Sequence, residues 1–410
     1  MESEPPSSSA VSADSQTPLR RGLAKRALGV RDGRDSPSIG LIRLADETPG
    51  VIRLARGEPD IPTPKHIIEA AKAALDEGRT GYTDPAGMPN LRDAIAHKVA
   101  ADGLIYDPAT EIIVTAGGQK GIALAMQTLL DPGDEVILAV PTYTSYEANV
   151  VLAGGVLVWV HTRLEDDFAL LPDAVVKALT PHSKLLAIVS PNNPTATVLT
   201  SAQLRALAQV AQEHGLLVLS DELYSEIRYD GLKSTSIATF PGMRDRTIVV
   251  NGFSKTYSMT GFRVGYMLGP ADYMRATVEP RHSFSISTPM VSQYAALAAL
   301  EGPQEFIAEM ISEYTARRDT MAKAFDELGI PYSLPQAAFY FWADISATGL
   351  PSVEFCQRGI RDHGVWFSPG AGFGEGAEGF IRISFLAPPD VLTEALRRFG
   401  NLYRECVSRD

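Results

Sequence analysis

The sequence has few of the residues that build disulfide frameworks, metal centres or membrane spans. Its 410 residues include two cysteines, Cys356 and Cys406, which are too few for a disulfide framework and fit a reducing compartment. The seven histidines show no paired spacing typical of a metal site, so we expect no metal. No apolar run approaches the ~20 residues that a transmembrane helix needs, so we expect no membrane partner.

Basic residues are also in short supply. The chain has 37 Lys and Arg against 49 Asp and Glu, which gives a net charge of −12 and a pI near 5.2. Such a balance argues against nucleic acid or an anionic membrane as a partner. Hydrophobic residues make up 45% of the chain, enough for a large core, and its length predicts more than one domain. Together with the cysteine count, this favours a cytoplasmic enzyme.

The N-terminal residues differ in composition from the rest of the chain. Residues 1–18 are rich in Ser, Pro and acidic side chains, which is typical of disorder. A basic stretch follows, but Glu2, Glu4 and Asp14 precede it, and transit peptides are poor in acidic residues. We therefore predict a disordered N-terminal arm over residues 1–36.

Helical and strand patterns alternate from residue 64 to about residue 302, which predicts a mostly parallel sheet. The helical patterns cover residues 65–75, 90–101 and 202–213. A long amphipathic helix is expected from residue 304 to about 328, followed by strands near 339–343 and 380–385. After the arm, we predict an N-terminal segment that packs on the small domain (37–63), a large domain (64–302) and a small C-terminal α+β domain (303–410).

The most informative stretch of the chain begins with the apolar run at residues 247–250, which predicts a buried strand. Lys255 follows it, and burial disfavours the charged form of a lysine and frees the amine to attack a carbonyl. Arg263, eight positions on, offers a planar fork suited to a phosphate. A Schiff-base amine beside a phosphate site is what pyridoxal phosphate requires.

Two other predicted strands end on polar residues of matching chemistry. Asp221 follows the run at 215–220, and a carboxylate there is costly unless a cation, such as a protonated pyridine nitrogen, meets it. Asn193 follows the run at 185–190, and Pro194 biases it to an extended conformation from which its amide can donate to a ring oxygen. Open α/β sheets bind ligands at the carboxyl ends of their strands, so we expect these residues to meet there.

Each of the three features has an ordinary structural alternative. Lys255 could belong to a surface Ser-Lys pair, Asp221 could cap a helix, and the Asn193-Pro194 pair could mark a plain turn. All three alternatives must hold together to dismiss the pattern. We therefore favour a pyridoxal-phosphate site.

The same residues resemble the motifs of a known family. Ser254-Lys255 with Arg263, the Asn193-Pro194-Thr195-Ala196 turn, and Asp221 with Tyr224 three residues on are similar to those of the class I/II pyridoxal-phosphate-dependent aminotransferases, near the bacterial aspartate and aromatic aminotransferase subgroup. The resemblance runs from about Gly40 to the C-terminus. It implies an α/β fold of type I: a large domain with a mostly parallel seven-stranded sheet flanked by helices, and a smaller α+β domain.

The resemblance implies a role for each matching residue. Lys255 forms the Schiff base and carries a proton, Asp221 pairs with the pyridine nitrogen, and Tyr224 hydrogen-bonds the ring hydroxyl oxygen. The implied cofactor-binding set is Gly118, Gln119, Lys120, Tyr143, Asn193, Asp221, Tyr224, Ser254, Lys255, Arg263 and Tyr82. The implied substrate-binding set is Arg382, Gly57 and Asn193.

Four parts of the implied site lie outside the central motifs: the start of one helix and three single residues. Gly118, Gln119 and Lys120 are expected to open a helix whose N-terminus receives the phosphate. The other three have alternatives from the residues alone: Tyr143 as a core aromatic, Tyr82 as an exposed loop residue, and Arg382 as a solvent-facing strand residue. In the family, Tyr143 would stack on the pyridine, Arg382 would bind the substrate carboxylate, and Tyr82 would reach the phosphate of the other subunit of a homodimer.

The sequence departs from the family pattern at three places. Ala196 and Ala337 stand where glycine is usual, and Gly252 stands where some members have a phosphate-binding serine, although glycine is also common there. If position 196 requires a positive φ, alanine is strained there. These changes affect the expected shape of the pocket rather than its chemistry.

The leading hypothesis is an aminotransferase that moves an amino group from an L-amino acid to a 2-oxo acid by a ping-pong mechanism. The alternative is an enzyme with the same fold and cofactor that performs γ-elimination or replacement, cyclisation or oxidation in a specialised pathway. A ligand-sensing DNA-binding regulator on this fold is disfavoured, because the segment before the fold is short and mostly polar.

Overall fold

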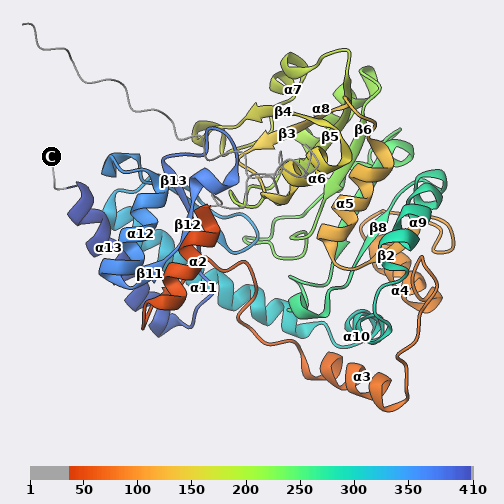
Figure 1. The fold of residues 1–410 in the computed structure, drawn as a ribbon, viewed down its shortest axis with the longest axis horizontal. Coiled ribbons are helices and arrows are strands. Elements are labelled where there is room, and N and C mark those ends of the chain that lie inside the picture. Colours follow the sequence, from red (N-terminus) through yellow and green to blue (C-terminus); the bar gives the residue numbers. More distant parts are fainter. Residues whose placement is uncertain (1–36, 408–410) are drawn as a thin grey trace, which may run out of the picture.

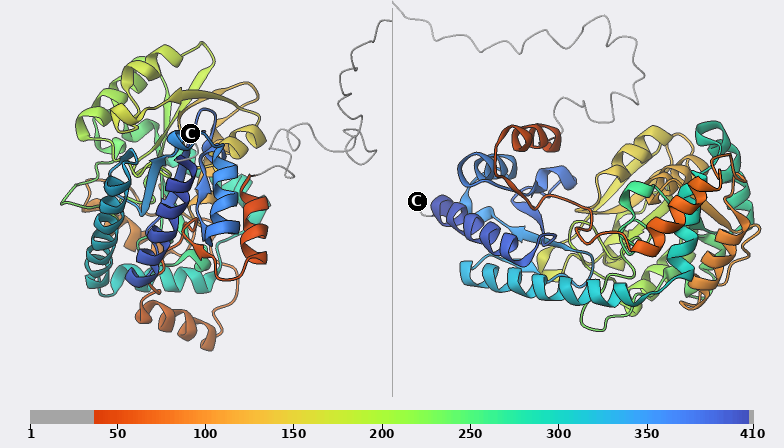
Figure 2. Two further views of the ribbon diagram at one scale, coloured as in Figure 1. Left: turned by 90° about the vertical axis from the view of Figure 1, so that its left-hand side faces the viewer. Right: turned by 90° about the horizontal axis from the view of Figure 1, so that it is seen from below.

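The computed structural model describes residues 37–407, and the predicted arm over residues 1–36 lies outside the described residues. The elements form a larger group around one sheet and a smaller group around another, and helix α11 (Glu305–Leu328) runs from the first to the second (Figures 1 and 2). We propose that the two domains divide in the short connection between α10 (Met290–Glu301) and α11.

The larger group is built on a seven-stranded sheet in the order β2-β8-β7-β6-β5-β3-β4. Its strands are β2 (Ile112–Thr115), β3 (Glu135–Val140), β4 (Val156–His161), β5 (Ser183–Val189), β6 (Leu217–Asp221), β7 (Thr247–Gly252) and β8 (Gly265–Leu268). Only β8 runs antiparallel to its neighbours β2 and β7. The predicted mostly parallel seven-stranded sheet is therefore confirmed.

Helices cover both faces of this sheet, which explains why its strands are continuous apolar runs. Along β5, Leu185 and Ala187 pack in one buried cluster with α5, while Leu186 and Ile188 pack in another with α8. The helices of this group are α3 (Lys65–Asp76), α4 (Pro89–Ala100), α5 (Gly118–Leu129), α6 (Ser145–Ala153), α7 (Pro172–Ala178), α8 (Ser201–Glu213), α9 (Ala271–Ser285) and α10. The predicted helices at 65–75, 90–101 and 202–213 correspond to α3, α4 and α8.

The smaller group has an antiparallel four-stranded sheet in the order β12-β13-β10-β9. Its elements are β9 (Tyr332–Ser333), β10 (Tyr340–Asp344), α12 (Ser352–His363), β11 (Val365–Trp366), β12 (Ser368–Pro369), β13 (Phe380–Ser384) and α13 (Pro389–Val407). The chain before the larger group also joins it: β1 (Ile52–Arg53) pairs with β11, and α2 (Pro37–Glu47) packs on α12. Short 3₁₀ helices lie in connections: η2 (Leu164–Asp166), η3 (Ile237–Thr239), η4 (Arg244–Arg246), η5 (Thr260–Phe262), η6 (Ser346–Thr348) and η7 (Gly370–Phe373).

The two alanines that replace glycine differ in their backbone conformation. Ala196 has a φ of +59° and is fully buried, so the strain expected for a positive φ applies to it. Ala337 has no positive φ, and its neighbour Ala338 has a φ of +55° instead. The departure at position 337 is therefore unstrained.

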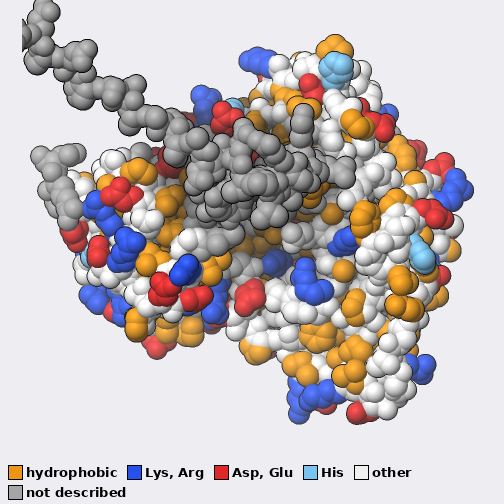
Figure 3. All heavy atoms as spheres, in the orientation of Figure 1, with side chains coloured by type: hydrophobic (Ala, Val, Ile, Leu, Met, Phe, Trp, Pro, Cys, Tyr) orange, Lys and Arg blue, Asp and Glu red, His pale blue; other side chains and the backbone are white. Residues whose placement is uncertain are grey.

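The described surface is mixed in character. Acidic and basic side chains are interspersed over the face shown in Figure 3. Within residues 37–407, no helix combines the length and the apolar character needed to cross a membrane.

Candidate active site

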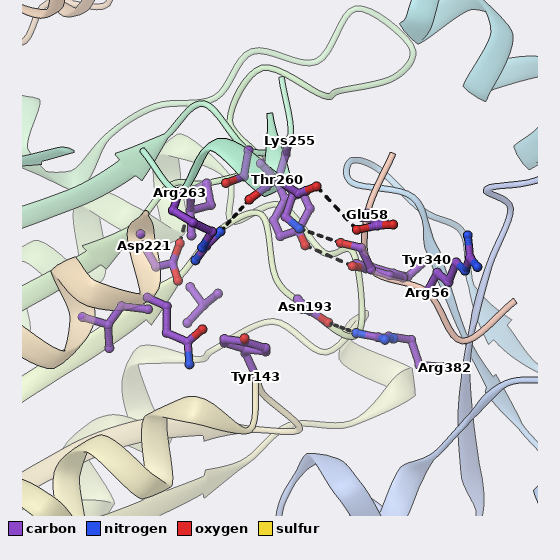
Figure 4. A pocket seen from close by; sticks show the side chains of 18 residues that line it. Arg56, Glu58, Tyr143, Asn193, Asp221, Lys255, Thr260, Arg263, Tyr340 and Arg382 are labelled. Atoms are coloured by element: carbon purple, nitrogen blue, oxygen red, sulfur yellow. Dashed lines mark hydrogen bonds between the residues drawn. The ribbon is translucent and has the colours of Figure 1, made fainter. Parts of the chain in front are cut away.

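A cavity of about 530 Å³ lies where the carboxyl ends of β5, β6 and β7 face β10 and β13 (Figure 4). Side chains from both groups line it, so the site needs the smaller sheet as well as the larger one. The predicted residues that line it are Gly57, Gly118, Gln119, Tyr143, Asn193, Asp221, Tyr224, Ser254, Lys255, Arg263 and Arg382.

Lys255 lies just after β7, with its side chain directed into the cavity (Figure 4). Its Nζ donates a hydrogen bond to the carbonyl oxygen of Gly57 at 2.5 Å. Burial, followed by the charge of Arg382, lowers the pKa of Lys255 from 10.5 to about 8. A lysine with this pKa is more readily deprotonated near neutral pH, and the unprotonated amine is the nucleophilic form.

Asp221 is the last residue of β6, and only 4% of it is exposed. Its carboxylate accepts hydrogen bonds from Tyr146 Oη at 2.8 Å and from the Leu223 amide at 3.2 Å. Burial raises its pKa to about 6, against the effect of these hydrogen bonds. No ion pair within residues 37–407 includes Asp221, so the cavity holds a buried carboxylate that lacks a cation.

Arg382 lies in the middle of β13 and is 9% exposed, so it does not face solvent. Its Nη1 donates to Asn193 Oδ1 and its Nη2 to the Ala55 carbonyl oxygen, both at 2.9 Å. Its Nε has no hydrogen-bond partner within residues 37–407. Every partner of this guanidinium among the described residues is neutral, so its charge is free to bind an anion.

A third cationic group, Arg263, lies beside the N-terminus of α5. A Cβ added to Gly117 would lie 2.8 Å from Arg263 Nη2, so the absence of a side chain lets the guanidinium approach the start of the helix. Gly117 also has a φ of +81°, which favours glycine. The free amides of a helix N-terminus and a guanidinium together make an anion site.

Three tyrosines complete the cavity. Tyr224 is buried, and its Oη lies 3.1 Å from Tyr340 Oη, a residue that the sequence interpretation did not identify. Figure 4 shows Tyr143 on the opposite side of the cavity from Lys255. Tyr143 and Lys255 therefore face the cavity from opposite sides.

Two predicted residues lie outside the cavity of this single chain. The Lys120 ammonium lies 4.7 Å above the Phe284 ring, and its backbone amide already donates to the Gly117 carbonyl within the helix. The Lys120 side chain therefore does not line the cavity, and the expected part of Gly118, Gln119 and Lys120 in a phosphate site at the start of α5 stays a prediction. Tyr82 is 77% exposed and does not line the cavity.

The sequence interpretation missed Tyr340, Tyr146, Glu58 and Thr260. Tyr146 stands in the stretch that includes Tyr143, but only the fold brings its hydroxyl within 2.8 Å of Asp221 Oδ2. Thr260 Oγ1 lies 3.4 Å from Glu58 Oε2, which joins the loop at 54–60 to the loop after Lys255. Their pairings span long sequence separations, so no local signal predicts them.

Comparisons with known proteins agree with this geometry. The family described as "Aminotransferase class I and II" matches residues 49–399. An aromatic-amino-acid aminotransferase 2 from Thermococcus litoralis is 40% identical over 89% of this chain and 95% of its own length. The aspartate/prephenate aminotransferase from Thermus thermophilus is 35% identical over 93% of this chain and 99% of its own.

Solved structures show the same likeness. The aromatic aminotransferase from Pyrococcus horikoshii superposes with a TM-score of 0.85 at 39% identity, covering 89% of this chain and 99% of that one. The aspartate aminotransferase from Thermus thermophilus with maleate gives a TM-score of 0.87 at 36% identity, covering 93% and 100%. The chain therefore belongs to the class I and II aminotransferase family.

Proposed function

We propose that this enzyme uses pyridoxal 5′-phosphate to move an amino group from an L-amino acid to a 2-oxo acid by a ping-pong mechanism. One observation carries the proposal: a single cavity joins an amine of lowered pKa, the Asp221 carboxylate, which pairs with no cation within residues 37–407, and the guanidiniums of Arg263 and Arg382, which pair with no carboxylate there. Each of these groups matches one part of the cofactor or substrate.

The residues present fit the cofactor. Arg263, Ser254 and the N-terminus of α5 at Gly118 and Gln119 would hold its phosphate, because Arg263 lies against the start of α5 and all four residues line the cavity. Asp221 would meet the pyridine nitrogen, which supplies the cation that this buried carboxylate lacks. The remaining contacts would come from Tyr143 on the ring face, from Asn193 and Tyr224 on the ring oxygen, and from Lys255 through its amine.

When bound, pyridoxal phosphate supplies an electron sink that stabilises negative charge on the substrate carbon. Arg382 would bind the substrate carboxylate with its planar fork, and its bond to Asn193 fixes the orientation of that fork. Lys255 Nζ would take and return the proton at the substrate carbon, since a lysine with a pKa of about 8 exchanges protons readily near neutral pH.

We also propose a homodimer in which Tyr82 enters the partner's site. Tyr82, Leu75 and Phe284 are large apolar side chains that are 77%, 54% and 59% exposed. The Thr83 amide donates to Ser287 Oγ at 3.3 Å, so the segments that carry Tyr82 and Phe284 are neighbours. A contiguous exposed apolar surface is typical of an interface between subunits. The chain has two cysteines, both buried, and this low number supports a cytoplasmic location.

A mixing experiment tests the dimer. A Tyr82→Ala chain and a Lys255→Ala chain are each expected to be nearly inactive, but a hybrid dimer keeps one native site if Tyr82 acts across the interface. Refolding an equal mixture should then restore about one quarter of wild-type activity. A mixture no more active than its components would show that Tyr82 acts within its own chain or not at all.

The reaction is tested with aspartate, glutamate, tyrosine and phenylalanine as donors and 2-oxoglutarate as acceptor. The expected result is one 2-oxo acid formed for each amino group transferred, without free ammonia, and no turnover by Lys255→Ala. Ammonia release or a cyclic product in place of transfer would support the alternative reaction. No product from any amino acid would overturn the proposal.

A further inference from the structure

Tyr340 lies between Arg382, the proposed substrate-binding residue, and Tyr224, a proposed cofactor-binding residue. It lies in β10 and is 1% exposed, with its ring fixed against Phe339 at a centroid distance of 4.8 Å. The Arg382 guanidinium carbon lies 4.3 Å above its ring, and its hydroxyl lies 3.1 Å from that of Tyr224. Among the described residues, Tyr224 is the one hydrogen-bond partner of the Tyr340 hydroxyl.

The hydrogen bond between two hydroxyls can run in either direction, and the charges around it decide which. A cation over a phenol ring favours the loss of the phenol proton, which makes that phenol the better donor. Arg382 holds this position over Tyr340 at 4.3 Å, whereas Lys255 Nζ lies farther from the Tyr224 ring, at 5.9 Å. The charge on the Lys255 nitrogen would also titrate once it is joined to the cofactor, while arginine stays charged.

We propose that Tyr340 is a positioning residue whose hydroxyl donates to Tyr224 Oη and thereby directs the Tyr224 proton into the cavity, toward the ring oxygen of the cofactor. This inference rests on the proposed function. Hydrogen bonds in a chain polarise one another, so a Tyr224 hydroxyl that accepts from Tyr340 is itself a stronger donor. Donation to the ring oxygen favours its anionic form and lowers the basicity of the lysine-linked cofactor.

The test is a pH titration of the absorbance of the lysine-linked cofactor in purified holoenzyme, a readout independent of turnover. Tyr340→Phe keeps the ring beneath Arg382 and removes only the hydroxyl. It should raise the pKa of the chromophore by about 0.3 to 0.5 unit, and Tyr224→Phe should raise it by about 1 unit. Because Tyr340 acts through Tyr224, the double variant should match Tyr224→Phe.

Tyr332→Phe is the matched control. Tyr332 lies in β9 of the same sheet but does not line the cavity, and its hydroxyl donates to Asp326 Oδ1 at 2.9 Å. The substitution should leave the titration unchanged. No shift in Tyr340→Phe, a downward shift, or an equal shift in the Tyr224→Phe background would each overturn the inference while leaving the proposed function intact. Wild-type protein that forms no such chromophore with added pyridoxal phosphate would overturn both.

Discussion

Gly57 provides a sharp test of how the cavity is packed. Its carbonyl oxygen accepts the hydrogen bond from Lys255 Nζ at 2.5 Å, and a Cβ added to it would lie 2.8 Å from Tyr340 Oη. This distance is shorter than real Cβ contacts, so Gly57→Ala must move either the tyrosine or the loop at 54–60. The Tyr340 ring is 1% exposed and enclosed by packed side chains, so we expect the loop to move.

The cost of Gly57→Ala follows from this clash. Adding one methyl group to a well-packed site costs about 1–3 kcal/mol. Displacement of the loop also lengthens the bond from Lys255 to the Gly57 carbonyl and disturbs the Ala55 carbonyl that holds Arg382. If this cost falls on the assembled site, kcat/KM should drop by roughly 5- to 150-fold, with KM rising because Arg382 is displaced.

The same geometry predicts a second substitution that should restore the activity of Gly57→Ala. Tyr340→Phe deletes the clashing oxygen, and the next atom, Cζ, would lie at an ordinary contact distance of 3.9 Å. Gly57→Ala should therefore cost less than about threefold in a Tyr340→Phe background, measured by steady-state kinetics of all four members of the cycle. Gly261→Ala is the control, because a Cβ there meets nothing within 4 Å. Native kcat/KM in Gly57→Ala, or a loss that persists in the double variant, would refute the reasoning.

Three further predictions follow from buried groups. Tyr146→Phe removes the hydrogen bond that lowers the pKa of Asp221, so the acid limb of the kcat/KM profile should move up by about 1 unit; an unmoved limb would contradict this. Ala196→Gly should change the free energy of unfolding in urea by less than about 1 kcal/mol, because relief of about 1–2 kcal/mol of φ strain is offset by a lost buried methyl and a more flexible unfolded chain. A larger destabilisation would show that the strain is absent or relieved elsewhere. Apo Lys255→Met should be more stable than apo wild type at pH 7 by about 3 kcal/mol, because the native pKa of about 8 lies below the 10.5 of the unfolded chain. That advantage should shrink as pH rises from 8 to 10.5, because in this range only the unfolded state keeps the lysine proton. A stability difference that stays constant with pH would contradict this prediction.

The sequence predicted the large sheet and its strand ends well because both depend on local patterns. The apolar runs before Asn193, Asp221 and Lys255 are set by burial on both faces, and parallel strands must present their carboxyl ends at one edge. The family and the fold type were therefore within reach of the sequence and are confirmed. The roles of the individual side chains stay predictions.

The rest of the site depends on contacts between distant segments. Tyr224 and Tyr340 are 116 positions apart, and Tyr146 and Asp221 are 75 apart. Residue type indicates that a buried hydroxyl needs a partner, but not which one. The motif beside Gly118 likewise does not indicate where the Lys120 side chain points, and the turn of the helix carries it to Phe284.

The cations in this cavity keep their charge available because their hydrogen-bond acceptors are neutral. Arg382 donates to the Asn193 amide oxygen, the Ala55 carbonyl and the Ser368 hydroxyl, and Lys255 donates to the Gly57 carbonyl. These acceptors orient the donors as well as a carboxylate would, but a carboxylate would occupy the anion site of Arg382 and raise the pKa of Lys255. Two of the four acceptors are backbone carbonyls of the loop at 54–60. The loop at 54–60 therefore orients Lys255 and Arg382 together without placing a carboxylate against either of them.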